Sequence, residues 1–257
     1  MKTIKDIKEA LNNEQQYQSW MEEIKSDERL GVQKVWQQWL RKKAKLDKLI
    51  AEHGEKLEFD NSYRTHPTAN IAGTDEAGRG PLAGPVVTAA VILPKDCPEL
   101  VGLNDSKQLS KETRESFMAK IMECTIATSI HFQPAEVIDD LNIYEATKQS
   151  MKASIEMLQV KPDFVLADAM TLPIDIPQDS IIKGDAKSLA IAAASILAKT
   201  ARDHYMEEMD VKYPQYGFAQ HAGYGTKQHL EALREFGPTD IHRTTFEPIK
   251  SMMLKKG

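Results

Sequence analysis

The run from Val86 to Leu93 is apolar at nearly every position, and this feature constrains the fold most. A short run of this kind is typical of a strand buried on both faces of a sheet. Further strand-like runs at Ile71 to Asp75, 125 to 132, 164 to 167 and 181 to 183 alternate with helical patterns. We therefore expect an α/β domain with a central sheet.

The helical patterns that separate these runs are longer. They cover residues 111 to 123, 135 to 158, about 188 to 209, and 226 to 236. The second has a possible break near Asn142, and the last begins at a Thr226 cap and stops at Gly237-Pro238. The first half of the third helix is small and apolar, which suits packing flat on a sheet.

The first part of the chain has a different composition. Residues 3 to about 53 contain no proline and carry apolar side chains at helical spacing, which predicts a helical segment. All three tryptophans and a basic run between residues 33 and 48 lie there. Aromatic and basic residues together can grip nucleic acid, but a small bundle with buried tryptophans and solvated lysines is the more usual arrangement. With residues 54 to 70 as a linker, we expect an N-terminal appendage at 1–70, which possibly binds nucleic acid, and a catalytic domain at 71–257.

Composition limits the partners and the compartment. The net charge of −5 over 257 residues argues against general attraction to nucleic acid, so such a partner must meet a local basic patch. Cys97 and Cys124 have no metal-type spacing and are too few for a disulfide framework. The N-terminus mixes charged and apolar residues, and the chain has no apolar run of 18 residues. We predict a cytoplasmic protein with no membrane segment.

Carboxylates follow the ends of the predicted strands. Asp75 and Glu76 lie between the first strand and a turn rich in glycine and proline, Asp168 follows the strand at 164 to 167, and Asp185 follows the last strand. Each could simply cap a turn, but strand ends in an α/β domain are where ligands commonly bind. Clustered acids repel one another unless cations neutralise them, and their oxygens suit Mg²⁺ or Mn²⁺. Two such ions about 4 Å apart can clamp the oxygens of a phosphodiester during displacement.

Four motifs in order resemble the bacterial type 2 ribonucleases H, the ribonuclease HII family. They are Gly-Thr-Asp-Glu-Ala-Gly-Arg-Gly-Pro-Leu-Ala-Gly-Pro from Gly73, Asn-Asp-Ser-Lys-Gln-Leu-Ser from Asn104, Lys-Gly-Asp-Ala-Lys-Ser from Lys183, and Gly-Tyr-Gly-Thr from Gly223. The resemblance covers residues 71 to about 250. It implies an RNase H-like five-stranded mixed sheet whose first three strands are antiparallel, with helices on both sides.

The resemblance also implies the activity. Members of this family are metal-dependent endonucleases that hydrolyse the RNA strand of RNA–DNA hybrids and cut 5′ of ribonucleotides embedded in duplex DNA, which suits ribonucleotide excision repair. The products carry 3′-hydroxyl and 5′-phosphate ends. Asp75, Glu76, Asp168 and Asp185 match the family's catalytic acids, which hold Mg²⁺ or Mn²⁺, and a two-metal mechanism is expected.

Other matching residues are expected to bind substrate. Gly78, Arg79 and Gly80 match the family's ribose-sensing turn, since backbone groups free of side chains can approach a 2′-hydroxyl. Tyr224 matches the tyrosine that packs on a sugar at the RNA–DNA junction, although a tyrosine between two glycines can also anchor its loop. Among the lysines, Lys107 and Lys187 are candidate phosphate contacts, as is Lys199, for which an ordinary exposed helix lysine is the stronger interpretation.

Three histidines are expected to have no functional role, and two other functions are alternatives. His221, His229 and His242 lack metal-ligand spacing, so solvated or capping roles are expected. Type 3 ribonucleases H are an alternative, but usually carry Ser-Gly-Lys-Gly where Ala-Gly-Arg-Gly stands from position 77. A catalytically silent hybrid-binding module is the other alternative, and it gains nothing from four acids that face a polyanion.

Overall fold

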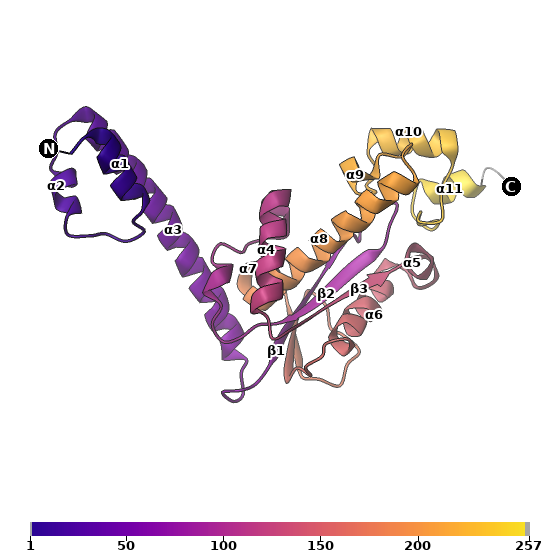
Figure 1. Cartoon of the computed structure of the whole chain (residues 1–257). Coiled ribbons are helices and arrows are strands. Elements are labelled where there is room, and N and C mark those ends of the chain that lie inside the picture. Colours follow the sequence, from indigo (N-terminus) through magenta and orange to yellow (C-terminus); the bar gives the residue numbers. More distant parts are fainter. Residues whose placement is uncertain (1, 255–257) are drawn as a thin grey trace. The chain divides into compact units, whose positions relative to one another are not determined.

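A computed structural model describes residues 2–254 and contains one five-stranded sheet (Figure 1). Its strands are β1 (Ile71–Ala77), β2 (Val86–Ile92), β3 (Ala127–Gln133), β4 (Phe164–Asp168) and β5 (Gln178–Ile181). The order across the sheet is β3-β2-β1-β4-β5. Strands β1, β2 and β3 pair antiparallel, whereas β4 pairs parallel to both β1 and β5. The predicted mixed sheet is therefore confirmed.

Helices cover both faces of the sheet. Ala89 and Val91 of β2 point to a core shared with α4 (Lys111–Cys124) and α8 (Leu189–Lys212). The intervening residues of β2, Ala90 and Ile92, point to a second core shared with α6 (Ile143–Glu156). Because successive strand residues face opposite sides, a strand buried on both faces must be apolar throughout, and every residue of β2 is buried.

Helix α8 lies close to the central strand, and Gly73 of β1 makes this approach possible. A Cβ at Gly73 would lie 2.3 Å from the backbone carbon of Ala190, so any side chain there would push the helix off the sheet. The small apolar residues at the start of α8 are all buried, as expected from their composition. The Ser188 hydroxyl caps this helix by accepting from the N–H of Ile191.

The remaining helices include several with local sequence signals. Asn142 ends α5 (Ala135–Leu141) at φ 70° and caps α6 through its side chain, so the predicted break is confirmed. Thr226 caps α10 (Lys227–Phe236), which also agrees with the sequence. The short helices are α7 (Gly184–Lys187), α9 (Phe218–His221), α11 (Ile249–Leu254), and the 3₁₀ turns Pro98–Leu100 and Ser106–Gln108.

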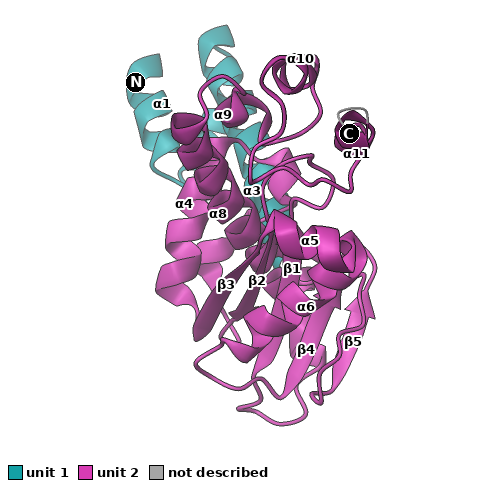
Figure 2. Cartoon of the chain, turned by 90° about the vertical axis from the view of Figure 1, so that its right-hand side faces the viewer, with its two compact units in different colours: residues 1–54 teal, residues 55–257 magenta. Residues whose placement is uncertain are grey.

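The chain divides into two compact units, residues 1–54 and 55–257 (Figure 2). The first contains α1 (Ile4–Asn12), α2 (Met21–Lys25) and most of α3 (Leu30–Ser62). Trp36 and Trp39 stack with ring centroids 5.1 Å apart and are both buried, in a core that also contains Val32. Trp36 and Trp39 thus pack inward, as expected for a small bundle with buried tryptophans.

Two sequence expectations are wrong. The predicted linker at 54–70 is helical as far as Ser62, and this last part of α3 packs within the second unit. Asp60 accepts from the N–H of Ala190, and Phe59 packs in a core with Ile71. The last strand ends at Ile181, before the predicted residues Ile182 and Lys183, because Lys183 adopts a left-handed φ of 57°. In the part of the chain that the structure describes, no helix has the length and apolarity to span a membrane.

Candidate active site

A cleft of about 640 Å³ opens where β1 and β4 end. Most of the residues expected to act on substrate line it, together with several that were not expected. Its lining is Asp75, Glu76, Ala77, Gly78, Arg79, Gly80, Ser106, Lys107, Arg114, Asp168, Asp185, Ser195, Lys199, Arg202 and Tyr224.

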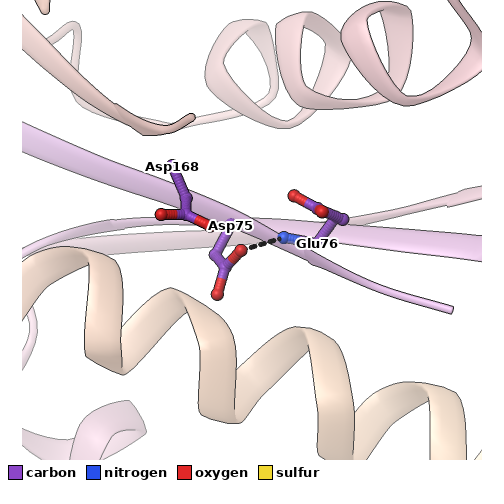
Figure 3. Close-up of side chains that lie close together, drawn as sticks. All are labelled: Asp75, Glu76 and Asp168. Carbon is purple, nitrogen blue, oxygen red and sulfur yellow. Dashed lines mark hydrogen bonds between the residues drawn. The ribbon is translucent and has the colours of Figure 1, made fainter. Parts of the chain in front are cut away.

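Asp75 and Asp168 are neighbours because their strands run parallel. Thr74 of β1 pairs with Ala167 of β4, so the next residue of each strand is an aspartate. Figure 3 shows the two carboxylates side by side. Asp75 is almost fully buried, and its Oδ1 accepts from the N–H of Glu76 at 2.7 Å. The register of two strands thus brings together acids that are far apart in sequence.

Glu76 completes an acidic cluster with the two aspartates. One carboxylate oxygen from each of the three acids lies within 4.8 Å of the others. Glu76 Oε1 is 3.5 Å from Arg79 Nη1, whereas Oε2 is buried and has no hydrogen-bond partner among the described residues. A buried carboxylate oxygen without a donor is costly, which indicates that this oxygen faces a ligand when the site works.

Burial and neighbouring acids raise the pKa values of all three acids. Burial raises the pKa of Asp75 well above its usual range, and the charges of Glu76 and Asp168 add to the rise. Burial also raises the pKa of Glu76, which Arg79 partly offsets. For Asp168, burial raises the pKa, the N–H of Gly184 opposes this, and Asp185 raises it further. The nearby positive charges of Arg79 and Lys107 are therefore too weak to offset burial, and the ionised forms of the acids need further stabilisation.

These features fit a divalent cation. Hard cations such as Mg²⁺ bind carboxylate oxygens, and a cation held by these acids would offset their repulsion and could satisfy the unpaired oxygen of Glu76. Asp185 lines the same cleft and is near enough to raise the pKa of Asp168, but it is not among the three acids that cluster within 4.8 Å. Asp185 is the second residue of α7. It follows Gly184, whose N–H donates to Asp168 Oδ1 at 2.7 Å.

The turn after β1 forms one side of the cleft. Gly78 has a φ of 92°, and a Cβ there would lie 2.0 Å from Arg202 Nε, so only glycine fits. Arg79 and Gly80 are exposed at the cleft. This arrangement leaves the backbone of the turn open to a ligand.

Tyr224 lies beside this turn. A Cβ at Gly80 would be 3.6 Å from the Tyr224 ring, and the ring is 48% exposed. Its loop is held by backbone bonds from Tyr224 N–H to His221 O at 2.9 Å and from Leu82 N–H to Gly223 O at 2.9 Å. The backbone therefore anchors the loop, and the ring is free to contact a substrate.

The three candidate lysines differ in position. Lys107 is exposed, lines the cleft, and its charge lowers the pKa of Asp168. Lys187 is exposed on α7 but is not among the residues that line the cleft. Lys199 lines the cleft and pairs with Asp203 at 2.6 Å, so the expectation of an ordinary exposed helix lysine does not describe it.

Sequence analysis missed several residues of the cleft. Ser195 hydrogen bonds to Asp75 and lies 3.1 Å from the Ser106 hydroxyl, so two buried serines support the acidic cluster. The motif from Asn104 contained Ser106, and a serine in the apolar start of α8 was the available signal for Ser195. Arg114 also lines the cleft and pairs with Asp203 at 3.0 Å. Arg202 also lines the cleft and carries no local signal.

The three histidines are buried, so the expectation of solvated side chains is wrong. The Thr239 N–H donates to His242 Nδ1 at 2.9 Å, which leaves the proton of a neutral His242 on Nε2. His242 Nε2 is 3.0 Å from His229 Nε2, and His229 Nδ1 is 2.9 Å from the Tyr224 carbonyl oxygen. Both rings can be neutral if His242 Nε2 donates to His229 Nε2 and His229 Nδ1 donates to the Tyr224 carbonyl. These hydrogen bonds therefore support the loop that carries Tyr224.

The sheet order, the clustered acids and the cleft at the ends of β1 and β4 define a nuclease of the ribonuclease H type. Comparisons with known proteins agree with this class. The family model described as Ribonuclease HII matches residues 72–249, and the Ribonuclease HII N-terminal domain matches residues 3–64. The chain belongs to the ribonuclease HII family, and it is a ribonuclease H.

Similar proteins cover nearly the whole chain. Ribonuclease HII of Bacillus licheniformis is 49% identical over 250 residues, which are 97% of this chain and 98% of that protein. Ribonuclease HII of Enterococcus faecalis is 50% identical over 256 residues, covering 98% of each. The crystal structure of ribonuclease H2 from Pyrococcus horikoshii OT3 has a TM-score of 0.64 at 27% identity, and covers 72% of this chain and 98% of that one. A structure of Bst-RNase HIII in complex with Mn²⁺, at 18% identity and a TM-score of 0.55, shares the fold and covers 74% of this chain and 71% of that one.

Ribonucleases H depend on divalent metal ions, and the acidic triad described above can hold one. The match to the N-terminal domain model favours the type 2 family over the type 3 alternative. Named enzymes at about half identity over nearly full length also argue against a catalytically silent binding module.

Proposed function

We propose that this protein cuts duplex DNA on the 5′ side of an embedded ribonucleotide and hydrolyses the RNA strand of RNA–DNA hybrids. The products would carry 3′-hydroxyl and 5′-phosphate ends. The observation that carries the proposal is the shared cleft, in which the acids lie beside a backbone turn and an exposed tyrosine. Chemistry at a phosphodiester and recognition of one sugar can thus take place together.

The acids would hold Mg²⁺ or Mn²⁺ next to the scissile phosphate. Bound divalent ions neutralise the phosphate and help to generate the attacking hydroxide. Asp75, Glu76 and Asp168 supply clustered oxygens, and Asp185 supplies a further carboxylate in the same cleft. Arg79, which lies 3.5 Å from Glu76, can contact a phosphate and limit the repulsion between acid and substrate.

The neighbouring groups would select the substrate. The backbone of Gly78, Arg79 and Gly80 can approach a 2′-hydroxyl, which distinguishes a ribonucleotide from a deoxyribonucleotide. The Tyr224 ring would pack on the sugar at the RNA–DNA junction. Lys107 would contact a phosphate in the cleft, whereas Lys187 could do so only outside it.

The first unit would add affinity rather than chemistry. The exposed basic side chains on α3 form a local positive surface, and all four acids lie in the other unit. The exposed members are Lys34, Arg41, Lys42, Lys45 and Lys48. Such a surface binds phosphate without reading sequence. Since the proposed substrates contain DNA and the relatives are bacterial, we also infer that the protein works in the cytoplasm.

A substrate panel tests the proposal. The panel is a DNA duplex with one ribonucleotide, an RNA–DNA hybrid, an all-DNA duplex and single-stranded RNA, each with Mg²⁺ and with Mn²⁺. We expect cleavage of the first two only, with the cut in the first on the 5′ side of the ribonucleotide. Extension of the upstream product by a polymerase and ligation of the downstream product identify the two ends. Cleavage on the 3′ side, or of all-DNA duplex, contradicts the proposal.

A further inference from the structure

Arg243 lies behind the turn that follows β1 and is fully buried. Its Nη1 donates to the Arg79 carbonyl at 2.8 Å, and its Nη2 donates to the Gly78 carbonyl at 2.5 Å. Its Nε and Nη2 donate to the Gly84 carbonyl at 3.1 and 2.9 Å. One guanidinium thus binds three carbonyl oxygens at the two ends of the turn.

Arg202 of α8 is a second buried guanidinium against the same segment. It donates to the carbonyls of Pro85 at 3.0 Å and Ala83 at 3.0 Å. Its Nη1 donates to the carbonyl of Ala222 at 2.9 Å, in the loop that carries Tyr224. Arg202 therefore joins the segment after β1 to the tyrosine loop.

Neither guanidinium has a carboxylate partner among residues 2–254. Burial of a cation without an acid is costly, and burial lowers the pKa of Arg243 to about 9 and the pKa of Arg202 to about 10. Both remain protonated at neutral pH. The planar fork of arginine can reach several carbonyls at fixed angles, which lysine or a neutral amide cannot.

The bonds to Arg243 determine which backbone groups of the turn are available. The carbonyls of Gly78 and Arg79 point inward to the guanidinium. Within the described part of the chain, no acceptor is found for the N–H groups of Arg79 and Gly80, and both residues line the cleft. The guanidinium also polarises the peptide units that it binds, which strengthens the neighbouring N–H groups as donors.

We propose that Arg243 is a positioning residue for ribose recognition: it fixes the Gly78-Arg79-Gly80 turn so that the N–H groups of the turn meet the 2′-hydroxyl, while Arg202 ties this turn to the Tyr224 loop. This inference rests on the proposed function, in which the turn reads the ribose. Arg243 itself does not line the cleft.

Arg243→Lys in the full chain tests the inference, because lysine keeps the charge but has a single nitrogen, which cannot reproduce the four hydrogen bonds that the three guanidinium nitrogens make. The readout is the Ki of an all-DNA duplex as competitive inhibitor divided by the KM of the same duplex with one ribonucleotide. We expect this ratio to fall about tenfold, since one good hydrogen bond corresponds to about a tenfold change in affinity. Unfolding curves measure stability in parallel.

Leu233→Ala is the matched control. Leu233 is fully buried on α10 in the same C-terminal core, so its truncation destabilises the region without touching the turn. We expect Leu233→Ala to keep the wild-type ratio. An unchanged ratio in Arg243→Lys, or an equal fall in Leu233→Ala at equal stability, overturns the inference.

Asp139→Ala decides the question if Arg243→Lys does not fold. Asp139 of α5 accepts from the backbone and hydroxyl groups of Thr244 and Thr245, and so anchors the segment directly after Arg243. A lower ratio supports the inference, and an unchanged ratio overturns it. A wild-type ratio near one has a different meaning: the proposed ribose recognition itself is then wrong, and the inference falls with it.

Discussion

Acidification should destabilise the region that carries Tyr224, because two buried histidines must become protonated there. Burial lowers the pKa of His229 to about 4 and that of His242 to about 4. Both rings are therefore neutral in the folded protein, whereas in the unfolded chain each has an ordinary pKa of about 6.5. Between these two values the unfolded chain binds more protons, so stability falls as the pH falls from about 6.5 toward 4.

The size of the effect follows from these pKa values. Lowering the pH from 7 to 5 should cost about 2 kcal/mol for one such histidine. The Nε2 atoms of the two rings are 3.0 Å apart, and the charge of His229 lowers the pKa of His242. The two protonations are therefore coupled, and the pair together should cost at most about 4 kcal/mol. Buried acids act in the opposite direction: burial raises the pKa of Asp60 to about 6, so Asp60 favours folding as the pH falls. A total stability curve would mix these contributions.

A double variant separates them. In His229→Asn with His242→Asn, the shorter amides can still donate to the Tyr224 carbonyl and accept from the Thr239 N–H, but they do not titrate. The variant should be less stable at every pH because the rings are lost from a packed cluster. The assay is urea unfolding at pH 7, 6 and 5, and the difference between wild type and variant should shrink by about 2 to 4 kcal/mol over this range. A difference that stays constant with pH refutes the reasoning.

Three further outcomes are expected. Asp185→Asn should abolish turnover in Mg²⁺ but leave the unfolding curve close to wild type, since an amide keeps the volume and removes a charged ligand; near-normal activity of the folded variant removes Asp185 from the site. Tyr224→Ala should slow cleavage at a single embedded ribonucleotide more than cleavage of a continuous RNA strand, and equal losses mean that the ring only anchors its loop. Replacing four exposed lysines of α3 with Gln should make the salt dependence of duplex binding shallower by up to about 0.9 per lost phosphate contact, while kcat stays unchanged. The four positions are Lys34, Lys42, Lys45 and Lys48, and identical salt slopes exclude a nucleic-acid role for them. Replacement of Lys148 and Lys152 of α6 is the control.

The sequence predicted the position of a strand correctly where the strand is completely buried, and misplaced a strand that is only partly buried. Strand β2 is buried at every position, so its apolar run was unambiguous. Strand β5 is an edge strand with two exposed residues, and its sequence is polar, so the apolar pair at 181 and 182 misplaced it. Ile182 is in fact 71% exposed. Only pairing with β4 determines where β5 lies.

The end of α3 was missed for a related reason. The sequence analysis ended the helical segment near residue 53, directly before Gly54. A Cβ at Gly54 would meet no other atom, so the helix simply tolerates a glycine at a cost of about 1 kcal/mol. Contacts distant in sequence, such as that of Asp60 with Ala190, hold the helix beyond this point. A fragment intended to contain the whole second unit must therefore start near residue 55, because a start at residue 68 removes these contacts.

The candidate site also contains some residues that the sequence predicted and others that it did not. The glycine turn and the acids Asp75, Glu76 and Asp185 were visible because each lies within a local motif, and Asp168 was visible because it follows a short apolar run. Arg243 contacts carbonyls 159 to 165 positions earlier in the chain, so no local pattern marks it. The histidines were misjudged because burial depends on the packing of Tyr216 and Phe218 around them, which no spacing rule gives.

Charge placement also explains how an acidic chain can bind a polyanion. The two guanidinium groups behind the turn remain protonated at neutral pH, and no carboxylate in the described part of the chain pairs with them. Their field therefore extends into the cleft that Arg202 helps to line. The low dielectric around a buried charge lets this field act more strongly than that of a surface lysine. The two groups lie behind the turn that we propose reads the sugar. A phosphodiester is therefore attracted to the turn even though the net charge of the chain is −5. Loss of either arginine should consequently weaken substrate capture as well as the geometry of the turn.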